Sequence, residues 1–440
     1  MDELNGAAIS STELATQVNQ SAKSETTDLE KNDPQSTSQL NSQNAVEKAE
    51  PQSASQNSLA NEQKPAGYNV EETRQNFYSF TLESLEAFLK TYGKEKFRAQ
   101  QIFKWVYEQR VTDFDQMLNL SKDLRAELKN LITFELPPIL KHLISVDGTQ
   151  KFLFDVGQGN SIEAVVIPSD DRLTLCVSSE IGCNMACQFC FTGKQKLKRR
   201  LTIAEIVGQF MQVQDVIGKK GLRLSNIVFM GMGEPLDNPD AVFGAIDVIH
   251  SPWGVNLSRK KITVSTSGLI PEMYRVAQAK VRLAVSLNGY DDEVRSKVMP
   301  INKKYPLKDL LDECRRYYRA TGDKITMEYV LLKGVTDQIE HARKLVDLLR
   351  DVPCKINIIP FNEHPGSGFE RPSDETVQAF HKKCMDLGAQ VLLRRTMGRD
   401  IYAACGQLTT KVDRPENMDI SNSKIGGTNV RSFSGGQPSV

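Results

Sequence analysis

From Arg172 onward, the pattern of hydrophobic and polar positions predicts a strand, a loop and a helix in a repeated order. Short runs that are almost wholly apolar predict strands, and longer segments with one apolar face predict helices between them. Strands of this kind belong to a parallel sheet covered by helices, so the pattern predicts an α/β fold. The predicted strands span 172–178, 225–230, 262–266, 281–287, 325–332 and 355–360, and the predicted helices span 202–217, 238–249, 306–320 and 337–350.

The chain before this region has a different pattern. Thr81 is a good N-cap for a helix whose apolar face contains Leu82, Leu85, Phe88 and Leu89. Two further helices are predicted, one around Ile102, Phe103, Trp105 and Val106 and one around Leu124 and Leu128. Alternating residues over 151–156 and 161–167, separated by Gly157 to Asn160, predict a β-hairpin.

Both ends of the chain are rich in small polar residues and poor in aromatic ones, so we expect disorder there. The predicted organisation is therefore a disordered acidic tail (1–74), a helical accessory domain (75–135), a linker with the hairpin (136–170), the α/β core (171–410) and a second disordered tail (411–440).

Charge adds one observation to this picture. The formal net charge is zero, but residues 1–76 carry twelve acidic and five basic residues, which leaves a net charge of +7 on the rest. A basic body suits a polyanionic partner such as RNA, although an ordinary solvated surface has the same composition.

The composition also bears on the compartment. The sequence contains no apolar run long enough to span a membrane and no signal-peptide pattern at its start. Eight cysteines in 440 residues do not suggest a disulfide framework, and we expect a cytoplasmic protein.

The strongest chemical signal is the spacing C-x3-C-x2-C formed by Cys183, Cys187 and Cys190. Three thiolates can bind three irons of a 4Fe–4S cluster and leave the fourth iron open for a ligand. The alternatives are a zinc knuckle or three buried thiols. A structural zinc site needs four ligands, and no histidine lies close in the sequence.

This spacing resembles the radical S-adenosylmethionine (SAM) superfamily. The resemblance implies an open (β/α)6 partial barrel of the TIM type, one 4Fe–4S cluster, and SAM bound through its amino and carboxylate groups to the open iron. Active sites of such folds lie at the carboxyl ends of the strands. The polar residues at those ends are accordingly expected to contact SAM: Gly233 and Glu234 of a G-x-G-E-P motif, Ser265, Ser286, Leu287, Asn288 and Asn362.

Two further cysteines narrow the resemblance. Cys176 lies in Leu175-Cys176-Val177-Ser178-Ser179, and Cys405 lies in Ala404-Cys405-Gly406-Gln407-Leu408. With Gly231-Met232-Gly233-Glu234-Pro235, these segments resemble the RlmN family of radical SAM methyltransferases over about residues 78 to 410. Asn288 departs from the family pattern, in which many members have His.

The RlmN resemblance implies methylation of C2 of one adenine in 23S rRNA and of the adenine 3′ of the anticodon in tRNA. Cys405 would accept a methyl group from one SAM molecule, and a radical made from a second SAM would activate that methyl group for addition to the base. Glu163 would remove the C2 proton. Cys176 would then attack Cys405 and release the RNA, which leaves a disulfide for a cellular reductant to reopen.

RNA recognition would need an extruded or single-stranded adenine. Basic residues follow the cysteine triplet and precede Cys405, and they could bind phosphate: Lys194, Lys196, Lys198, Arg199, Arg200, Arg394, Arg395 and Arg399. The resemblance also implies an electron donor such as flavodoxin, and we expect a monomer.

Two alternatives stay open at this point. The related Cfr enzymes methylate C8 of the same ribosomal adenine, and the strand-end motifs do not separate the two reactions. The other alternative is a non-catalytic RNA-binding protein that uses the cysteine triplet to hold a structural metal.

Overall fold

A computed structural model describes residues 74–409 of the chain. The tails predicted at 1–74 and 411–440 lie outside the described residues, apart from Arg74. Among residues 74–409, no helix has the length and apolar character that crossing a membrane requires.

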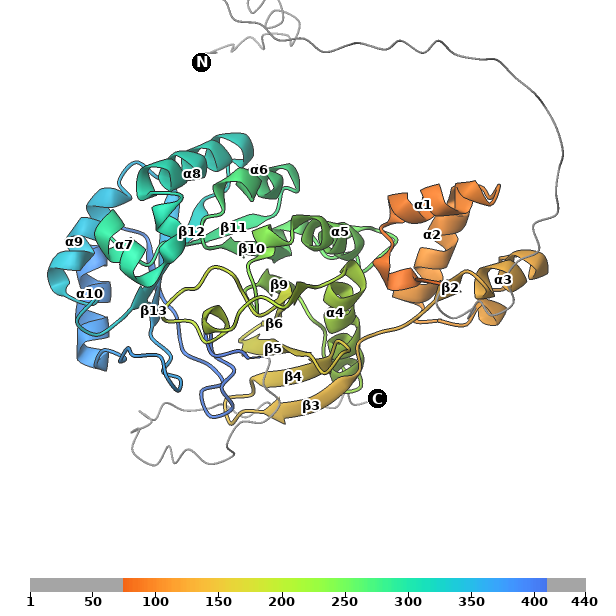
Figure 1. Cartoon of the computed structure of the whole chain (residues 1–440), viewed down its shortest axis with the longest axis horizontal. Coiled ribbons are helices and arrows are strands. Elements are labelled where there is room, and N and C mark those ends of the chain that lie inside the picture. Colours follow the sequence, from red (N-terminus) through yellow and green to blue (C-terminus); the bar gives the residue numbers. More distant parts are fainter. Residues whose placement is uncertain (1–73, 410–440) are drawn as a thin grey trace, which may run out of the picture. The chain divides into compact units, whose positions relative to one another are not determined.

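The centre of the fold is a ten-stranded sheet in the order β14-β13-β12-β11-β10-β9-β6-β5-β4-β3 (Figure 1). All neighbouring pairs from β6 to β14 are parallel, and β3 to β6 pair in antiparallel fashion. Since β14 and β3 are the two edges, the sheet is open rather than closed. The strands are β3 (Ile139–Ile144), β4 (Gln150–Asp155), β5 (Ser161–Ser169), β6 (Arg172–Cys176), β9 (Asn226–Phe229), β10 (Ile262–Thr266), β11 (Arg282–Ser286), β12 (Ile325–Leu331), β13 (Cys354–Pro360) and β14 (Val391–Leu393).

The six predicted parallel strands are therefore confirmed, and so is the predicted hairpin, which forms β4 and β5. The structure adds β14 and β3, which the sequence analysis did not predict. The added strand β3 lengthens the hairpin to three antiparallel strands, and β5 pairs with β6 through Val165 and Cys176. The hairpin is thus a continuation of the main sheet, which brings its residues next to the first strand of the core.

Helices follow the parallel strands, as the alternating pattern predicted. They are α4 (Ile203–Gly218), α5 (Pro239–His250), α6 (Ile270–Gln278), α7 (Asp292–Val298), α8 (Leu307–Thr321), α9 (Ile339–Leu348) and α10 (Asp374–Asp386). Only α4, α5, α8 and α9 were predicted. Two of the helices that were missed are short, since α6 has nine residues and α7 has seven.

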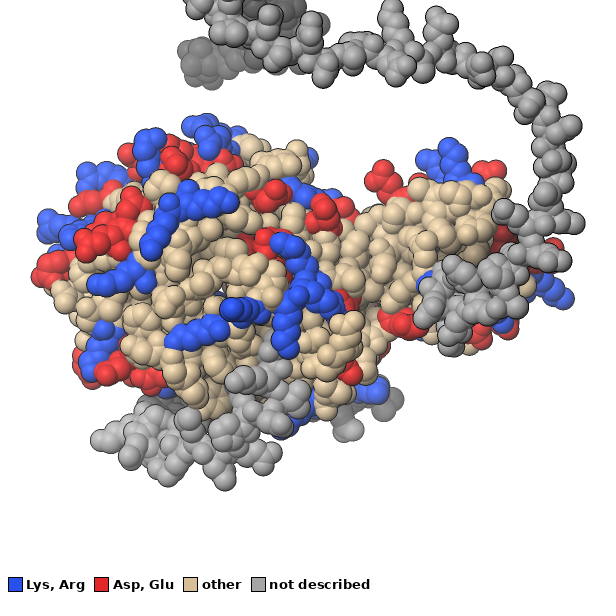
Figure 2. Space-filling model, viewed as in Figure 1, with Lys and Arg blue, Asp and Glu red and all other residues tan. Residues whose placement is uncertain are grey.

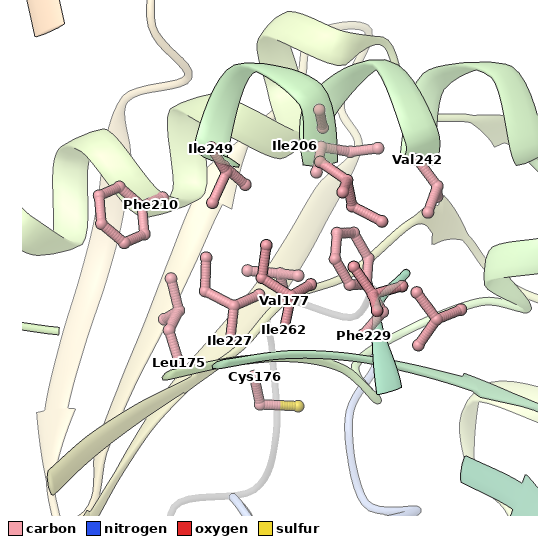
Figure 3. Close-up of a cluster of buried hydrophobic side chains, with 14 of the residues drawn as sticks. Leu175, Cys176, Val177, Ile206, Phe210, Ile227, Phe229, Val242, Ile249 and Ile262 are labelled. Atoms are coloured by element: carbon pink, nitrogen blue, oxygen red, sulfur yellow. The ribbon is translucent and has the colours of Figure 1, made fainter. Parts of the chain in front are cut away.

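Apolar side chains from the sheet and from the covering helices interdigitate in the core (Figure 3). Leu175, Ile227 and Ile262 lie on the sheet below Ile206 and Ile249. Because successive side chains of a strand point to opposite faces, Cys176 points away from this core, on the other side of the sheet (Figure 3). The thiol is thereby directed toward the face that carries the site.

The residues before the sheet form the predicted small helical region. Its helices are α1 (Leu82–Thr91), α2 (Phe97–Phe103), a π-helical turn at Lys104–Glu108, and α3 (Lys122–Lys129), and β1 (Gln75–Asn76) pairs with β2 (Ile132–Thr133). Thr81 caps α1, as predicted: its hydroxyl accepts the Ser84 N–H, and the Ser84 hydroxyl accepts the Thr81 N–H.

Candidate active site

The cysteine triplet lies in a loop that is closed at its base by two short strands. β7 (Glu180–Ile181) pairs with β8 (Arg199–Arg200), so the loop leaves and returns at the carboxyl end of β6. Gly182 has φ +83°, and a Cβ there would lie 2.2 Å from the Lys196 carbonyl oxygen. Glycine is the residue that fits this close approach, and it directs the chain into the turn that begins at Cys183.

All three cysteines line one pocket, which contains about 1040 Å³ of space free of protein atoms, counting the part open to solvent. Burial raises the pKa of each of the three thiols. Thiols in such surroundings stay protonated unless a metal replaces the proton. Within residues 74–409, no three His, Cys, Asp or Glu side chains converge on a position for a single metal ion. The ligands of a 4Fe–4S cluster bind separate irons and need not converge in this way.

The G-x-G-E-P motif, which comes directly after β9, also lines this pocket. Gly233 has φ +101°, and a Cβ there would lie 2.6 Å from the Glu180 Cβ. The Glu234 carboxylate is buried and accepts the N–H groups of Leu236 (3.1 Å) and Ser267 (2.7 Å). Burial raises the pKa of Glu234. The motif is therefore held in place by its own acid, while the glycines leave the backbone open to the pocket.

Residues from the ends of β10, β11 and β12 complete the wall. Ser265, Ser286 and Asn288, which the sequence analysis expects to contact SAM, all line the pocket. Leu287 does not line it, because its side chain is buried in the hydrophobic core. Glu328, which was not predicted, also lines the pocket, and one of its oxygens accepts a hydrogen bond from the Ser265 hydroxyl at 3.4 Å.

Three buried polar atoms of pocket residues have no hydrogen-bond partner: the Ser267 hydroxyl, Glu328 Oε1 and Asn362 Oδ1. Buried polar atoms in folded proteins are nearly always hydrogen-bonded, because leaving one unpaired costs about 1–3 kcal/mol. Three such atoms around one pocket fit a polar ligand that supplies both donors and acceptors.

Asn288 has a different environment from these orphaned atoms. Its amide oxygen accepts the Val330 N–H at 2.9 Å, and its amide nitrogen lies 3.3 Å from the Met299 sulfur. Asn288 also has φ +49°, a left-handed conformation that asparagine tolerates better than most residues. Its side chain thus joins the ends of β11 and β12.

Cys405 reaches the same pocket from the far end of the described chain. The Asn362 amide donates to the Cys405 carbonyl at 3.1 Å. The loop that carries the cysteine triplet, called the cluster loop below, holds the residues that follow Cys405. The Phe191 N–H donates to the Gly406 carbonyl at 2.8 Å, and the Thr192 hydroxyl donates to the Leu408 carbonyl at 2.7 Å. Cys405 is therefore fixed against the loop that carries the triplet.

Cys176 and Cys405 line a second, smaller cavity together with Arg394, with about 450 Å³ of space free of protein atoms by the same measure. Cys176 is buried, and burial raises its pKa well above the ordinary value. Both cysteines are reduced in the structure. Two thiols that are distant in the sequence thus meet at one cavity, and Cys405 belongs to both the large pocket and the small one.

Glu163 is buried and does not line either of these two pockets. This burial excludes a solvent-facing position for Glu163 on its strand. The carboxylate forms an ion pair with Lys151 at 3.0 Å and accepts the Thr409 N–H at 2.9 Å. Glu163 is therefore linked to the segment that carries Cys405.

Several basic residues of the cluster loop have partners within the protein. Arg199 forms two hydrogen bonds with the Glu205 carboxylate, at 2.8 and 2.6 Å, and Arg200 pairs with Asp237 at 2.9 Å. The space-filling view nevertheless shows Lys and Arg side chains over the middle of the viewed face (Figure 2). Exposed Lys194, Lys196 and Lys198 surround the cluster loop, and Lys194 donates to the Gly366 carbonyl.

The sequence analysis missed two charged residues of the site, Glu328 and Glu180. Glu180 is fully buried, and its carboxylate accepts the Glu234 N–H at 2.8 Å. Its position directly before the cysteine loop was the available signal, since an acid between apolar and small residues is unusual. Glu328 interrupts the apolar strand β12, which was the equivalent signal there.

Comparisons with known families agree with this geometry. Residues 75–134 match the family model described as the ribosomal RNA large subunit methyltransferase N-terminal domain, and residues 179–346 match the radical SAM superfamily.

Relatives that match most of the chain agree with these two family models. The chain is 72% identical over 358 residues to the dual-specificity RNA methyltransferase RlmN of Bdellovibrio bacteriovorus, which covers 81% of this chain and 90% of that protein. The RlmN of Geotalea uraniireducens is 48% identical over 337 residues, covering 76% and 97% of the two chains. A crystal structure of a radical SAM methyltransferase from Sphaerobacter thermophilus superposes with a TM-score of 0.72 at 40% identity, covering 76% of this chain and 99% of that one.

Proposed function

The chain belongs to the RlmN family of dual-specificity RNA methyltransferases, and we propose that Cys405 carries the transferred carbon and Cys176 releases the RNA. The chain is a radical SAM enzyme that methylates C2 of adenine in ribosomal and transfer RNA. Membership of this family favours the predicted function over the C8 and non-catalytic alternatives. One observation carries the residue assignment: Cys405 lines the pocket of the cysteine triplet and also the cavity of Cys176.

The residues of the large pocket fit a 4Fe–4S cluster and SAM. Cys183, Cys187 and Cys190 would hold the cluster, and Gly233 and Glu234 would border the amino group of SAM. The atoms of Ser267, Glu328 and Asn362 that lack a hydrogen-bond partner match the hydroxyl, amino and ring-nitrogen groups of such a ligand. When bound, the cluster and SAM supply an organic radical that can remove a hydrogen atom from a methyl group.

Cys405 and Cys176 have complementary tasks in this proposal. The Cys405 thiolate displaces the sulfonium sulfur of a methyl donor, so a sulfur–carbon bond forms and the electron pair of the broken bond stays on the donor sulfur. The carbon on Cys405 is later joined to adenine C2. Cys176 attacks the Cys405 sulfur, forming a disulfide as the sulfur–carbon bond breaks. A thiol-based reductant then restores both cysteines.

The test uses three single variants with an RNA fragment that contains the target adenine. We expect Cys405→Ala to abolish methylation and Cys176→Ala to accumulate a covalent protein–RNA adduct on denaturing gels. Cys354→Ala, a cysteine outside both pockets, is the matched control and should turn over normally. Full methylation by Cys405→Ala would refute the assignment. Mass spectrometry of the product nucleoside separates C2 from C8 methylation.

Glu163 is the proposed base for the C2 proton. Its support is its connection through the Thr409 N–H to the segment of Cys405. RNA carrying deuterium at C2 tests this role, because Glu163→Gln should yield an adduct that retains the deuterium. Lys151→Met removes the partner of Glu163 while keeping the carboxylate, and it should yield adduct-free product. Rapid loss of deuterium in Glu163→Gln would exclude the role.

RNA binding is proposed for three exposed lysines, Lys194, Lys196 and Lys198, which follow the cysteine triplet in the chain. Their contribution would show as a salt dependence of RNA affinity. Replacing one lysine that binds a phosphate by glutamine would lower the slope of log affinity against log salt by about one. An electron donor such as flavodoxin and a monomeric state complete the proposal.

A further inference from the structure

The cavity between Cys176 and Cys405 contains a group to which the proposed reaction assigns no task. Arg394 lines this cavity with both thiols. The residue follows β14, and its N–H donates to the Ile358 carbonyl at 2.8 Å, so its backbone is fixed to the sheet. Its guanidinium lies 3.7 Å from Glu328 Oε1. Arg394 is therefore held at both ends beside the two cysteines.

The charges around Cys176 come from few groups. Cys405, Arg394 and Glu328 are the charged or titratable groups whose fields act on Cys176, and Arg395, which is exposed, also lines the cavity. Cys405 and Glu328 can carry negative charge, and Arg394 carries positive charge. Cys176 and Glu328 are buried, and about three quarters of the Arg394 side chain is covered by the protein. Little solvent is available there to screen these charges.

We propose that Arg394, anchored by Glu328, is a positioning residue that becomes the counter-ion of the Cys176 thiolate only after Cys405 has lost its negative charge. This inference rests on the proposed function, because that function requires the Cys405 thiolate to become a neutral thioether.

The physical reason is that two thiols share one guanidinium. While Cys405 is a thiolate, its negative charge compensates the positive charge of Arg394 and repels a second negative charge at Cys176. The thiol of Cys176 then keeps its proton and can neither accept a methyl group nor attack Cys405. Alkylation of Cys405 forms a sulfur–carbon bond and removes that charge, and the proton of Cys176 can then leave to water.

The electrostatic effects on the thiols agree with this order. After burial, the charge of Cys405 is the largest influence that raises the pKa of Cys176, and Arg394 lowers it. Arg394 interacts with Cys405 more strongly than with Cys176, because the Cys405 charge is the largest influence that raises the pKa of Arg394. The guanidinium therefore pairs with the Cys405 thiolate first, and it pairs with the Cys176 thiolate after Cys405 has become neutral.

The test measures the pH dependence of iodoacetamide alkylation at Cys176 by peptide mass spectrometry, using the reduced full-length protein without RNA. Cys405→Ala imitates the neutral state of Cys405, and we expect it to lower the alkylation midpoint of Cys176 by at least one pH unit relative to the parent protein. Adding Arg394→Gln to Cys405→Ala should reverse this shift, whereas Arg394→Lys should keep part of it. Arg399→Gln, an exposed arginine on the same segment, is the matched control and should leave the midpoint unchanged.

Equal midpoints in Cys405→Ala and in Cys405→Ala with Arg394→Gln would overturn the proposal. If Arg394→Gln fails to fold, Cys405→Ala alone decides, because removing the Cys405 charge should lower the Cys176 midpoint. An unchanged or raised midpoint in Cys405→Ala would then overturn the proposal. Alkylation requires no methyl transfer, so this result is separate from the proposed function, which fails only if methylation proceeds without Cys405.

Discussion

Arg295 is the largest side chain that is fully buried in the described part of the chain, and its replacement tests how the strand ends are held. Its guanidinium donates to the carbonyls of Leu287 (2.9 Å), Ser267 (2.6 Å) and Ser286 (3.3 Å) and to the Asn302 side chain (2.8 Å). Three of these acceptors belong to the ends of β10 and β11 and the loops after them, which border the large pocket. Arg295 therefore ties together two strand ends that carry residues proposed to contact SAM.

The magnitude follows from two opposing contributions. Burial lowers the pKa of Arg295 to about 10, which corresponds to a cost of about 3 kcal/mol for holding the charge in the interior. Hydrogen bonds to a charged donor stabilise by about 1.5 kcal/mol each at the lower end of their range, so the four bonds contribute about 6 kcal/mol. Arg295→Met, which keeps the length of the side chain but none of the donors, should therefore destabilise the fold by about 3 kcal/mol.

Thermal unfolding of the protein measures this loss. At about 2–4 °C per kcal/mol for a domain of this size class, we expect the midpoint to fall by about 6–12 °C. Arg295→Lys supplies one donor group in place of the planar fork and should lie between the two. Arg316→Met removes an exposed ion pair with Glu313 and should shift the midpoint by less than about 2 °C. If Arg295→Met and Arg316→Met have the same unfolding midpoint, the buried hydrogen bonds of Arg295 do not hold the strand ends.

The remaining predictions concern the loops beside the cluster. Burial raises the pKa of Glu180 to about 8, so the folded state binds its proton more tightly than the unfolded chain does. The stabilisation is fully present at pH values below the ordinary pKa of a glutamate and is lost as the pH rises through the folded-state value of about 8. Thermal stability should therefore fall between about pH 5 and pH 8, and Glu180→Gln should flatten this dependence; a parallel decline in both proteins would contradict the reasoning. Gly233→Ala should lower the unfolding midpoint and the SAM affinity measured by equilibrium dialysis, because its Cβ would meet Glu180. Gly221→Ala shares the positive φ but has open space around it, so it should cost only about 1 kcal/mol and leave SAM affinity intact.

Much of the core could be predicted because the apolar runs are also the strands. The run at 262–266 coincides with β10, and the others agree within one or two residues at most ends. The two edge strands escaped prediction for a physical reason. β14 has only three residues, and no residue of β3 is fully buried, so neither leaves a strong pattern in the sequence.

The site was predictable where the chemistry is local and not where it depends on tertiary contacts. The spacing of the three cysteines is enough to identify them as candidate cluster ligands, and a glycine at a strand end indicates a close approach of the backbone. Nothing local distinguishes Glu163 paired with Lys151 from a solvent-facing glutamate, because the pairing depends on the register between β4 and β5, which places Leu153 opposite Glu163. Glu328 lies inside an apolar strand and Arg295 inside a helix rich in charged residues, and only the fold shows what they bind.

The loop of Cys405 and the loop of the triplet support each other, and this mutual support sets the geometry of the reaction. Phe191 and Thr192 of the triplet loop hold the backbone of Gly406 and Leu408, and the Gln195 amide donates to the Thr409 hydroxyl at 2.7 Å. The thiol that we propose to carry the carbon is thus positioned by the same turn that ends the triplet. We therefore expect a change that loosens the triplet loop to displace Cys405 as well, so that cluster binding and methyl transfer are lost together. Backbone contacts between segments that are far apart in the sequence would in this way couple two chemically different steps.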